Sequence, residues 1–510
     1  MHPPLDSIQI PTVRILFYTD DPSSIWDAVS PGPGTLRGQR QEFGLGILKE
    51  AIESRSFIPR YVVDVLNRNY EYAIDGALGP HRAATLTLST ELLAPYDEVW
   101  FFGQHLAAFK VEHFDATEGG PDSELDSVEV AALRDWMDRR GGGILITGDH
   151  SNPVQDVADL EDQSLAGNIL NLGRALGYRM PRAGQMRVWV GPPGQFDGQV
   201  DTSGDTEMVA MPRQEDAKPQ SISTRVIDVR IGRWFFGRKR HPLFVRHSTD
   251  PLTAFLGVGV FPDHGHEGAL TSPANFTSKP SGPFPEADWP RGPGGVQPIP
   301  ETVAIGINQN TATPVALVSA YDGHVAGVGR IVADSTWHHY VNVNLHGFRD
   351  ALGNPSEVLD EIADYYENLL WYLFPPPGRA ALLRALVQYV SSLGSIREIL
   401  PGPKLKLGQV AVSALSEIAS LELVDDLVHS VSGLRATHLS HADGLPLLPP
   451  RELLWGHLLS VASSHRRAKH ANSDIDRWAS EAISLAAREY REELAARLEA
   501  MEDIARCTER

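Results

Sequence analysis

Residues 141–150 read Gly-Gly-Gly-Ile-Leu-Ile-Thr-Gly-Asp-His, and this stretch decides the fold class. Its apolar centre, Ile144–Ile146, is short and lies between Gly143 and the pair Thr147-Gly148, which predicts a buried strand. An amphipathic helix is predicted directly before it, over residues 126–140, with Asp126 or Ser127 as its N-cap. A helix that leads into a fully apolar strand is typical of a parallel sheet with helices on both faces.

The residues on either side of this stretch extend the same pattern. Strands are predicted over residues 13–19, 60–66 and 97–102, and a helix over residues 38–54 gives the chain a βαβ opening. Further on, residues 313–319 and 329–334 form a predicted strand pair whose turn contains Asp322-Gly323, a hairpin signal. We therefore expect an α/β fold with a mostly parallel sheet.

The triple proline at residues 375–377 marks the clearest boundary, because proline cannot continue a helix. We predict an α/β domain over residues 1–375, closed by a helix over 356–374, with a Gly/Pro-rich insertion around 177–300. Residues 262–300 are too long for a simple connection and predict a functional loop or flap. Beyond the prolines we predict a helical domain over residues 376–510, with helices at 379–393, 407–432, 450–466 and 473–506.

Composition excludes several classes of function. The 510 residues carry a net charge of -20, so the surface repels phosphate backbones and anionic lipid, and neither nucleic acid nor membrane is an expected partner. No secretory signal or long apolar run is found, which predicts a cytoplasmic protein. The single cysteine, Cys507, excludes a disulfide framework and makes thiol catalysis untenable. In contrast, 11 of the 19 histidines lie between His105 and His346.

Polar residues follow two of the predicted parallel strands, at the edge where such sheets bind ligands. Gly103, Gln104 and His105 follow one strand and predict a cofactor or ligand contact. Asp149 and His150 follow the next strand and are candidate catalytic residues, with His150 also a candidate metal ligand. The alternative for Asp149 is a structural role as the N-cap of a following helix.

A third group follows the strand at residues 329–334. Asp334, His338 and His339 lie together here, and imidazoles at a strand end suit acid-base catalysis or metal binding beside carboxylates. Neighbouring residues of an extended chain point in opposite directions, so one of the two histidines is expected to be structural.

Residues 263–267 hold four side chains that can bind metal or transfer protons. On an extended segment His264 and His266 face one way, while Asp263 and Glu267 face the other. Asp263, His264 and His266 are therefore candidate ligands of a divalent metal, although a solvated loop explains the same residues.

These elements together resemble the class I glutamine-amidotransferase-like superfamily, and within it the trehalose-utilisation (ThuA-like) branch. The resemblance covers about residues 12–375 and rests on residues 14–18, 97–103, 141–150, 241–244 and 329–339. It implies a flavodoxin-like sheet and a pocket chemistry without a thiol. The turn that holds the catalytic cysteine in true amidotransferases here offers Asp149 or His150.

Two functions from different classes remain open. The first is a hydrolase or lyase on a small polar molecule, with sugar derivatives among the candidates, in which His150 and His338 or His339 transfer protons or bind a divalent metal while Asp149 and Asp334 orient them. The second is a non-catalytic scaffold that forms homo-oligomers or binds a protein partner through residues 376–510. A binding module for a carbohydrate or nucleotide is a third possibility.

Overall fold

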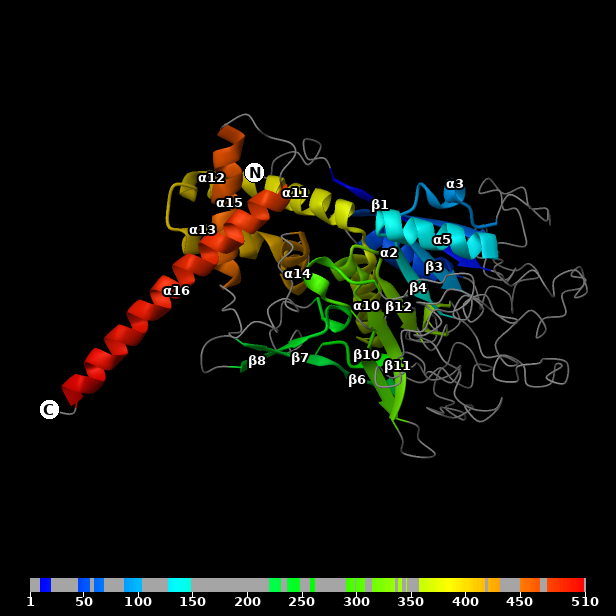
Figure 1. Cartoon of the computed structure of the whole chain (residues 1–510), viewed down its shortest axis with the longest axis horizontal. Helices are drawn as coiled ribbons and strands as arrows, with labels where there is room; N and C mark the ends of the chain where they lie inside the picture. The colour runs from blue at the N-terminus through cyan, green and yellow to red at the C-terminus, as the bar shows by residue number, and fades with distance from the viewer. Residues whose placement is uncertain are drawn as a thin grey trace, which may run out of the picture.

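A computed structural model gives the fold of this chain (Figure 1). The residues that the structure describes are 10–19, 45–55, 59–67, 87–102, 127–147, 220–230, 236–247, 257–261, 290–298, 300–307, 314–334, 338–341, 345, 357–417, 421–431, 450–467 and 475–508. Most of the loop expected at 262–300 lies outside these ranges.

An eight-stranded mixed sheet forms the centre of the molecule. Its strand order is β2-β1-β3-β4-β12-β11-β10-β6. The first five of these strands run parallel, and β11, β10 and β6 continue the sheet antiparallel. The bounds are β1 (Thr12–Thr19), β2 (Arg60–Asn67), β3 (Glu98–Phe102), β4 (Gly143–Ile146), β6 (Ser223–Thr224), β10 (Glu301–Ile307), β11 (Pro314–Tyr321) and β12 (Ile331–Asp334). The predicted strands, including the antiparallel pair β11 and β12, are confirmed.

Two short ribbons lie outside this sheet. Strand β5 (Gln220–Ser221) pairs antiparallel with β9 (Val260–Phe261), and β7 (Val226–Arg230) pairs antiparallel with β8 (Phe236–Arg240). A 3₁₀ turn over Pro242–Phe244 follows β8 and leads toward the site described below.

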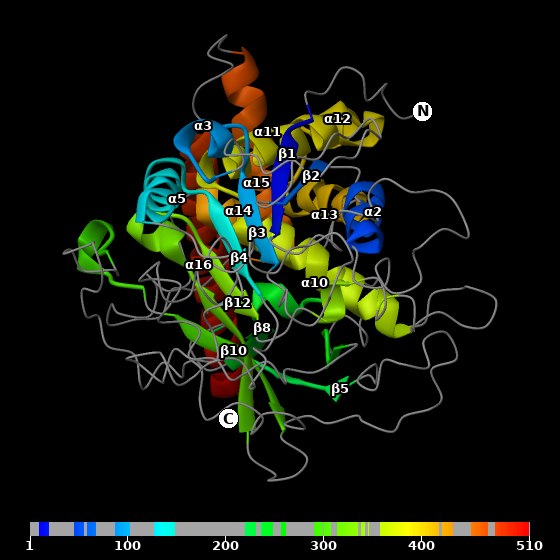
Figure 2. The same ribbon diagram turned by 90° about the vertical axis from the view of Figure 1, so that its right-hand side faces the viewer.

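Helices cover both faces of the sheet, as predicted. Alternate residues of β1 divide between the faces, with Val13, Ile15 and Phe17 in one hydrophobic cluster and Leu16 and Tyr18 in the other. The first face is covered by α2 (Gly46–Arg55) and α10 (Glu357–Leu373), and the second by α3 (Thr90–Leu93) and α5 (Ser127–Arg140). Figure 2 shows α5 on one side of the strands and α2 with α10 on the other.

The C-terminal region is helical. It consists of α11 (Pro376–Ser392), α12 (Gly394–Ile399), α13 (Lys404–Leu415), α14 (Leu421–Val431), α15 (Arg451–Arg467) and α16 (Ile475–Thr508). The triple proline begins a helix: Pro376 and Pro377 occupy the first turn of α11, where a missing N–H costs nothing.

The expected single helix over 407–432 is wrong. The chain forms two helices there, α13 and α14, because α13 ends with Ser416 as its C-cap. Helix α13 packs on α15, and α14 packs on α11. A continuous helix could not place its two halves against these two different neighbours.

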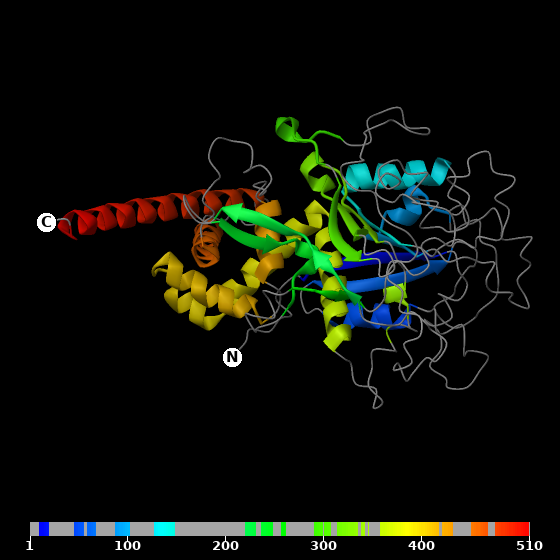
Figure 3. The same ribbon diagram turned by 90° about the horizontal axis from the view of Figure 1, so that it is seen from below.

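A single hydrophobic cluster joins the sheet to the helical region. It includes Phe17 and Val332 from the sheet, Leu369 from α10, and Leu386 and Trp455 from the helices beyond the prolines. The proposed domain boundary at residue 376 stays a prediction, but side-chain packing is continuous across it. The second half of α16 extends away from the body, as Figures 1 and 3 show.

Candidate functional site

Polar side chains lie on one face of the sheet at the carboxyl ends of its parallel strands. Ile146 of β4 pairs with Ala333 of β12, so the next residues, Thr147 and Asp334, lie beside each other. Leu145 and Val332 belong to the hydrophobic cluster on the side of the sheet that α10 covers. Thr147 follows Leu145 by two residues and Asp334 follows Val332 by two, so both face that same side, toward α10. Both side chains are fully buried.

Asp334 is the centre of the site. Its Oδ2 atom lies 2.9 Å from Nε2 of His339, and it accepts hydrogen bonds from the hydroxyls of Tyr340 at 2.8 Å and Tyr365 at 3.0 Å. His339 and Tyr340 come from the 3₁₀ turn His338–Tyr340, while Tyr365 comes from α10. The contacts from these three side chains therefore converge on one oxygen atom of Asp334.

The contact with Asp334 determines which ring nitrogen of His339 carries the proton. A carboxylate only accepts hydrogen bonds, so Nε2 carries the proton and donates it. In the neutral ring Nδ1 is then an acceptor. This atom is buried and has no hydrogen-bond partner among the residues that the structure describes. Nδ1 of His339 is thus an acceptor that no described residue occupies.

Aromatic rings hold this pair in place. The ring of Phe261 lies 4.7 Å from that of His339, and the ring of Tyr340 lies 4.5 Å from it, centre to centre. The hydroxyl of Tyr366 donates to the carbonyl oxygen of His339. Burial and the charge of Asp334 raise the pKa of Tyr340, Tyr365 and Tyr366 well above its usual value, so these phenols remain hydrogen-bond donors.

Thr147 was not predicted as a site residue. Its backbone N–H bonds to the carbonyl oxygen of Phe101, and its hydroxyl is buried without a hydrogen-bond partner in the described part of the chain. A buried unpaired hydroxyl is costly, and next to Asp334 it suits a contact with a polar ligand. The available signal was a hydroxyl residue at the last position of a buried apolar strand.

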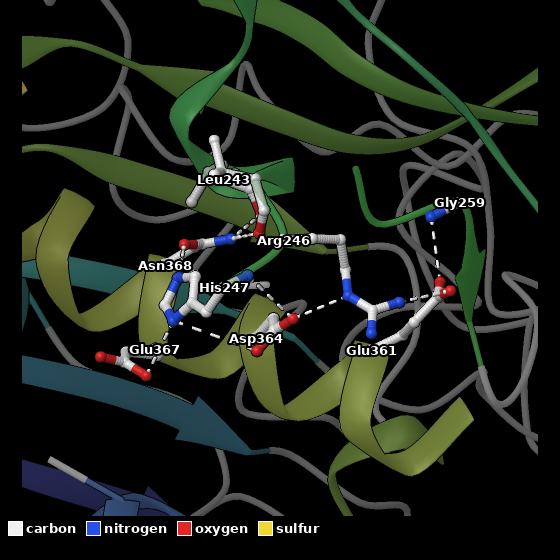
Figure 4. A network of polar contacts seen from close by, with 9 residues as sticks. Leu243, Arg246, His247, Gly259, Glu361, Asp364, Glu367 and Asn368 are labelled. Atoms are coloured by element: carbon white, nitrogen blue, oxygen red, sulfur yellow. Dashed lines mark hydrogen bonds and ion pairs between the residues drawn. The ribbon is translucent and has the colours of Figure 1, made fainter. Parts of the chain in front are cut away.

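A second polar network joins residues 243–247 and Gly259 to α10 (Figure 4). Arg246 bridges Asp364 at 2.7 Å and Glu361 at 2.6 Å. His247 lies between Glu367, 3.0 Å from its Nδ1, and Asn368, 2.8 Å from its Nε2. The amide of Asn368 also donates to the carbonyl oxygens of Leu243 and Val245. This network fixes α10, and with it Tyr365, against the segment after β8.

The charges around His247 affect its protonation. Burial lowers its pKa, but the neighbouring carboxylates of Glu367 and Asp364 and the hydrogen bonds to Glu367 and Asn368 outweigh burial, so the pKa is raised overall. In contrast, burial, assisted by the positive charge of Arg330, lowers the pKa of His241 to about 3. The first histidine favours the charged form and the second the neutral form.

The structure brings together two of the predicted site residues, Asp334 and His339. His338 begins the same 3₁₀ turn, and its side chain is not among those described. The other predicted residues lie outside the described ranges: Gly103, Gln104, His105, Asp149, His150, Asp263, His264 and His266. Tyr340, Tyr365 and Tyr366 were missed, because a tyrosine in an apolar pattern is indistinguishable from core.

Within the described ranges, no group of three or more His, Cys, Asp or Glu side chains is arranged to hold a metal ion. The same part of the chain contains no helix long and apolar enough to cross a membrane. Comparisons with protein-family models, with curated proteins and with solved structures found no match to this chain. The site must therefore be interpreted from its own geometry.

Proposed function

We propose that the protein is a cytoplasmic hydrolase or lyase that acts on a small polar molecule by acid-base catalysis, with sugar derivatives among the candidate substrates. The observation that carries the proposal is the fully buried pair of Asp334 and His339, whose Nδ1 has no hydrogen-bond partner among the described residues. An oriented imidazole with a free acceptor nitrogen is the arrangement that general base catalysis needs.

In this proposal His339 takes a proton from water or from a substrate hydroxyl at Nδ1. The ring then becomes an imidazolium, which the carboxylate of Asp334 stabilises through Nε2. Tyr340 and Tyr365 hold the carboxylate in place by hydrogen bonds. The hydroxyl of Thr147, one strand away, is available to orient a polar group of the substrate.

The strand order β2-β1-β3-β4 supports a further part of the proposal: the sheet is flavodoxin-like and related to the amidotransferase-like superfamily and its ThuA-like branch. The strand order reverses between β1 and β3, where such sheets bind ligands. Gly103, Gln104 and His105 follow β3 directly in the sequence, and Asp149 and His150 follow Thr147, so we retain them as proposed ligand and catalytic residues. A divalent metal on Asp263, His264, His266 and His150 belongs to the same proposal.

A scaffold that assembles through the C-terminal region is the second candidate. The observation in its favour is α16. Its first half is buried at residues such as Trp478, Ala482 and Ala486. In its second half, nine of the ten described side chains between Arg488 and Ala500 are exposed, and the tenth, Tyr490, is partly covered. Figure 3 shows this half extending away from the body. A partner or a second copy would pack here.

The test uses the full-length protein against a panel of sugar lactones, esters and glycosides. We expect His339→Gln to lower turnover at least about 100-fold, the usual contribution of a general base. A matched control is His465→Gln, which changes a surface histidine in α15. The proposal is wrong if folded His339→Gln keeps full activity on every substrate that the wild type converts.

The scaffold proposal is tested with a chain that ends at Ala487 and so lacks the exposed half of α16. Sedimentation compares this chain with the full-length protein, and the scaffold proposal requires that the shorter chain no longer assembles.

A further inference from the structure

Two buried arginines hold the C-terminal end of α10. Nη1 of Arg330 donates to the carbonyl oxygen of Tyr372 at 2.8 Å, and Nη1 of Arg379 donates to that of Trp371 at 2.5 Å. The last carbonyls of a helix have no partner within it, and the negative end of the helix dipole favours cations. The guanidinium of Arg330 also stacks on the ring of Tyr372, 4.2 Å from its centre.

Both arginines share one carboxylate. Oδ2 of Asp426, on α14, lies 3.7 Å from Nη1 of Arg330 and accepts a short hydrogen bond from Nη2 of Arg379. Arg330 is further paired with Asp322 at 2.8 Å, and Arg379 donates to the hydroxyl of Ser430 at 2.7 Å. Asp426 therefore connects the helical region to both arginines that hold α10.

The same two elements build the candidate site. Arg330 directly precedes β12, the strand that ends at Asp334. Helix α10 carries Tyr365 and Tyr366, which bond to Asp334 and to the backbone of His339, about two turns before its arginine-bound end. The position of α10 along its own axis thus determines whether the hydroxyl of Tyr365 reaches Asp334.

We propose that Asp426 is a positioning residue for the Asp334–His339 pair, so that the helical region sets the geometry of the site; the catalytic meaning of this coupling rests on the proposed function. Without the charge of Asp426, the two arginines lose a shared partner inside the protein and rearrange. Helix α10 then moves relative to β12, and the hydrogen bond from Tyr365 to Asp334 lengthens.

The experiment compares Asp426→Asn with Asp425→Asn in the full-length protein labelled with ¹⁵N-histidine. Asp425 is the neighbouring residue on α14, but it pairs with Arg451 of α15 at 2.8 Å, within the helical region. Two-bond ¹H–¹⁵N spectra identify which ring nitrogen carries the proton, and His339→Gln assigns the signal. We expect the His339 signal to move by more than its line width in Asp426→Asn and to stay in place in Asp425→Asn.

Asp426→Glu, which keeps the charge, should restore most of the wild-type signal. If Asp426→Asn does not fold, Asp426→Ser replaces it, since serine also removes the charge that the two arginines share. An unmoved His339 signal in the folded variant, or an equal movement in Asp425→Asn, overturns the proposal. Because the readout is the histidine ring, this outcome is independent of whether His339→Gln affects turnover.

Discussion

Nε2 of His339 lies 2.9 Å from Oδ2 of Asp334, with both side chains fully buried beneath α10. The pair sits at the carboxyl end of β12, in the middle of the sheet, and one oxygen accepts three hydrogen bonds there. A single atom therefore decides both the protonation of the imidazole and the packing of two tyrosines. The first prediction follows from this arrangement.

Asp334→Asn should destabilise the protein and change the histidine tautomer. An amide group cannot accept three hydrogen bonds on one atom as a carboxylate does, and its NH₂ group presented to Nε2 would move the imidazole proton to Nδ1. We expect a loss of about 2–4 kcal/mol in the free energy of unfolding, measured with urea. Tyr340→Phe, which removes one donor, should cost about 1 kcal/mol. Equal stability of wild type and Asp334→Asn would contradict the geometry.

His241→Asn should change how stability depends on acid. In the unfolded chain this histidine binds a proton near pH 6.5, whereas burial keeps it neutral in the fold down to about pH 3. Stability is thus lost as the pH falls from about 6.5 toward 3, by up to about 1.4 kcal/mol per pH unit from this group. The variant lacks this loss.

Asparagine is the matched replacement at this position, because Nδ1 of His241 accepts from the N–H of Leu243 as an N-cap and asparagine can do the same. Urea unfolding between pH 7 and pH 4.5 measures the difference in the free energy of unfolding between wild type and variant. Groups that titrate in both proteins contribute equally to both values and cancel in this difference. Parallel profiles would show that His241 does not stay neutral in the fold.

His247→Gln should change how stability depends on pH in the neutral to alkaline range. The pKa of His247 is raised in the fold by Glu367, Asp364 and Asn368 despite burial, so its contribution to stability is complete below about pH 6.5. That contribution is lost as the pH rises through the folded pKa. Arg246 and Glu361 complete the charged surroundings and are retained in the variant.

The measurement is the free energy of unfolding between pH 6 and pH 8.5. We expect the advantage of the wild type over His247→Gln to shrink as the pH rises. Glu367→Gln removes the closest carboxylate and should move this decline to lower pH. An advantage that stays constant over the whole range would disprove the charged pairing of His247.

Gly408→Ala should destabilise the helical region although alanine favours helices. A Cβ atom at Gly408 of α13 would collide with the carbonyl oxygen of Glu452 in α15, where the two helices are in close contact. Overpacking of this kind costs about 1–3 kcal/mol and exceeds the gain of about 1 kcal/mol in helix propensity. Thermal and urea unfolding measure the change. Gly394→Ala, with open space at its Cβ, is the control and should have little effect.

The sequence predicts the sheet well where the pattern is local. Residues 12–19 and 143–146 are short apolar runs between turn residues, and both form buried strands. The division of residues 407–432 into two helices could not be predicted, because it depends on the separate neighbours of α13 and α14. Periodicity describes which face of a helix is apolar but does not show what that face contacts.

The candidate site illustrates the same limit. Asp334 and His339 could be found because they are polar residues at the end of a predicted strand and shortly after it. Tyr365 could not, since it follows Asp334 by 31 residues in an amphipathic helix and only the packing of α10 brings its hydroxyl to the carboxylate. Asp426 was equally hidden, because an acidic residue on a predicted helix is ordinarily solvated.

The position of β12 also has a consequence for synthesis on the ribosome. Its parallel neighbour β4 ends at Ile146, but β12 begins only at Ile331, so one edge of β4 lacks its native partner until about 190 further residues have been made. At about 5–20 residues per second this takes on the order of 10–40 seconds. During this time an apolar strand edge is available for wrong pairing, so aggregation of the nascent chain competes with its folding.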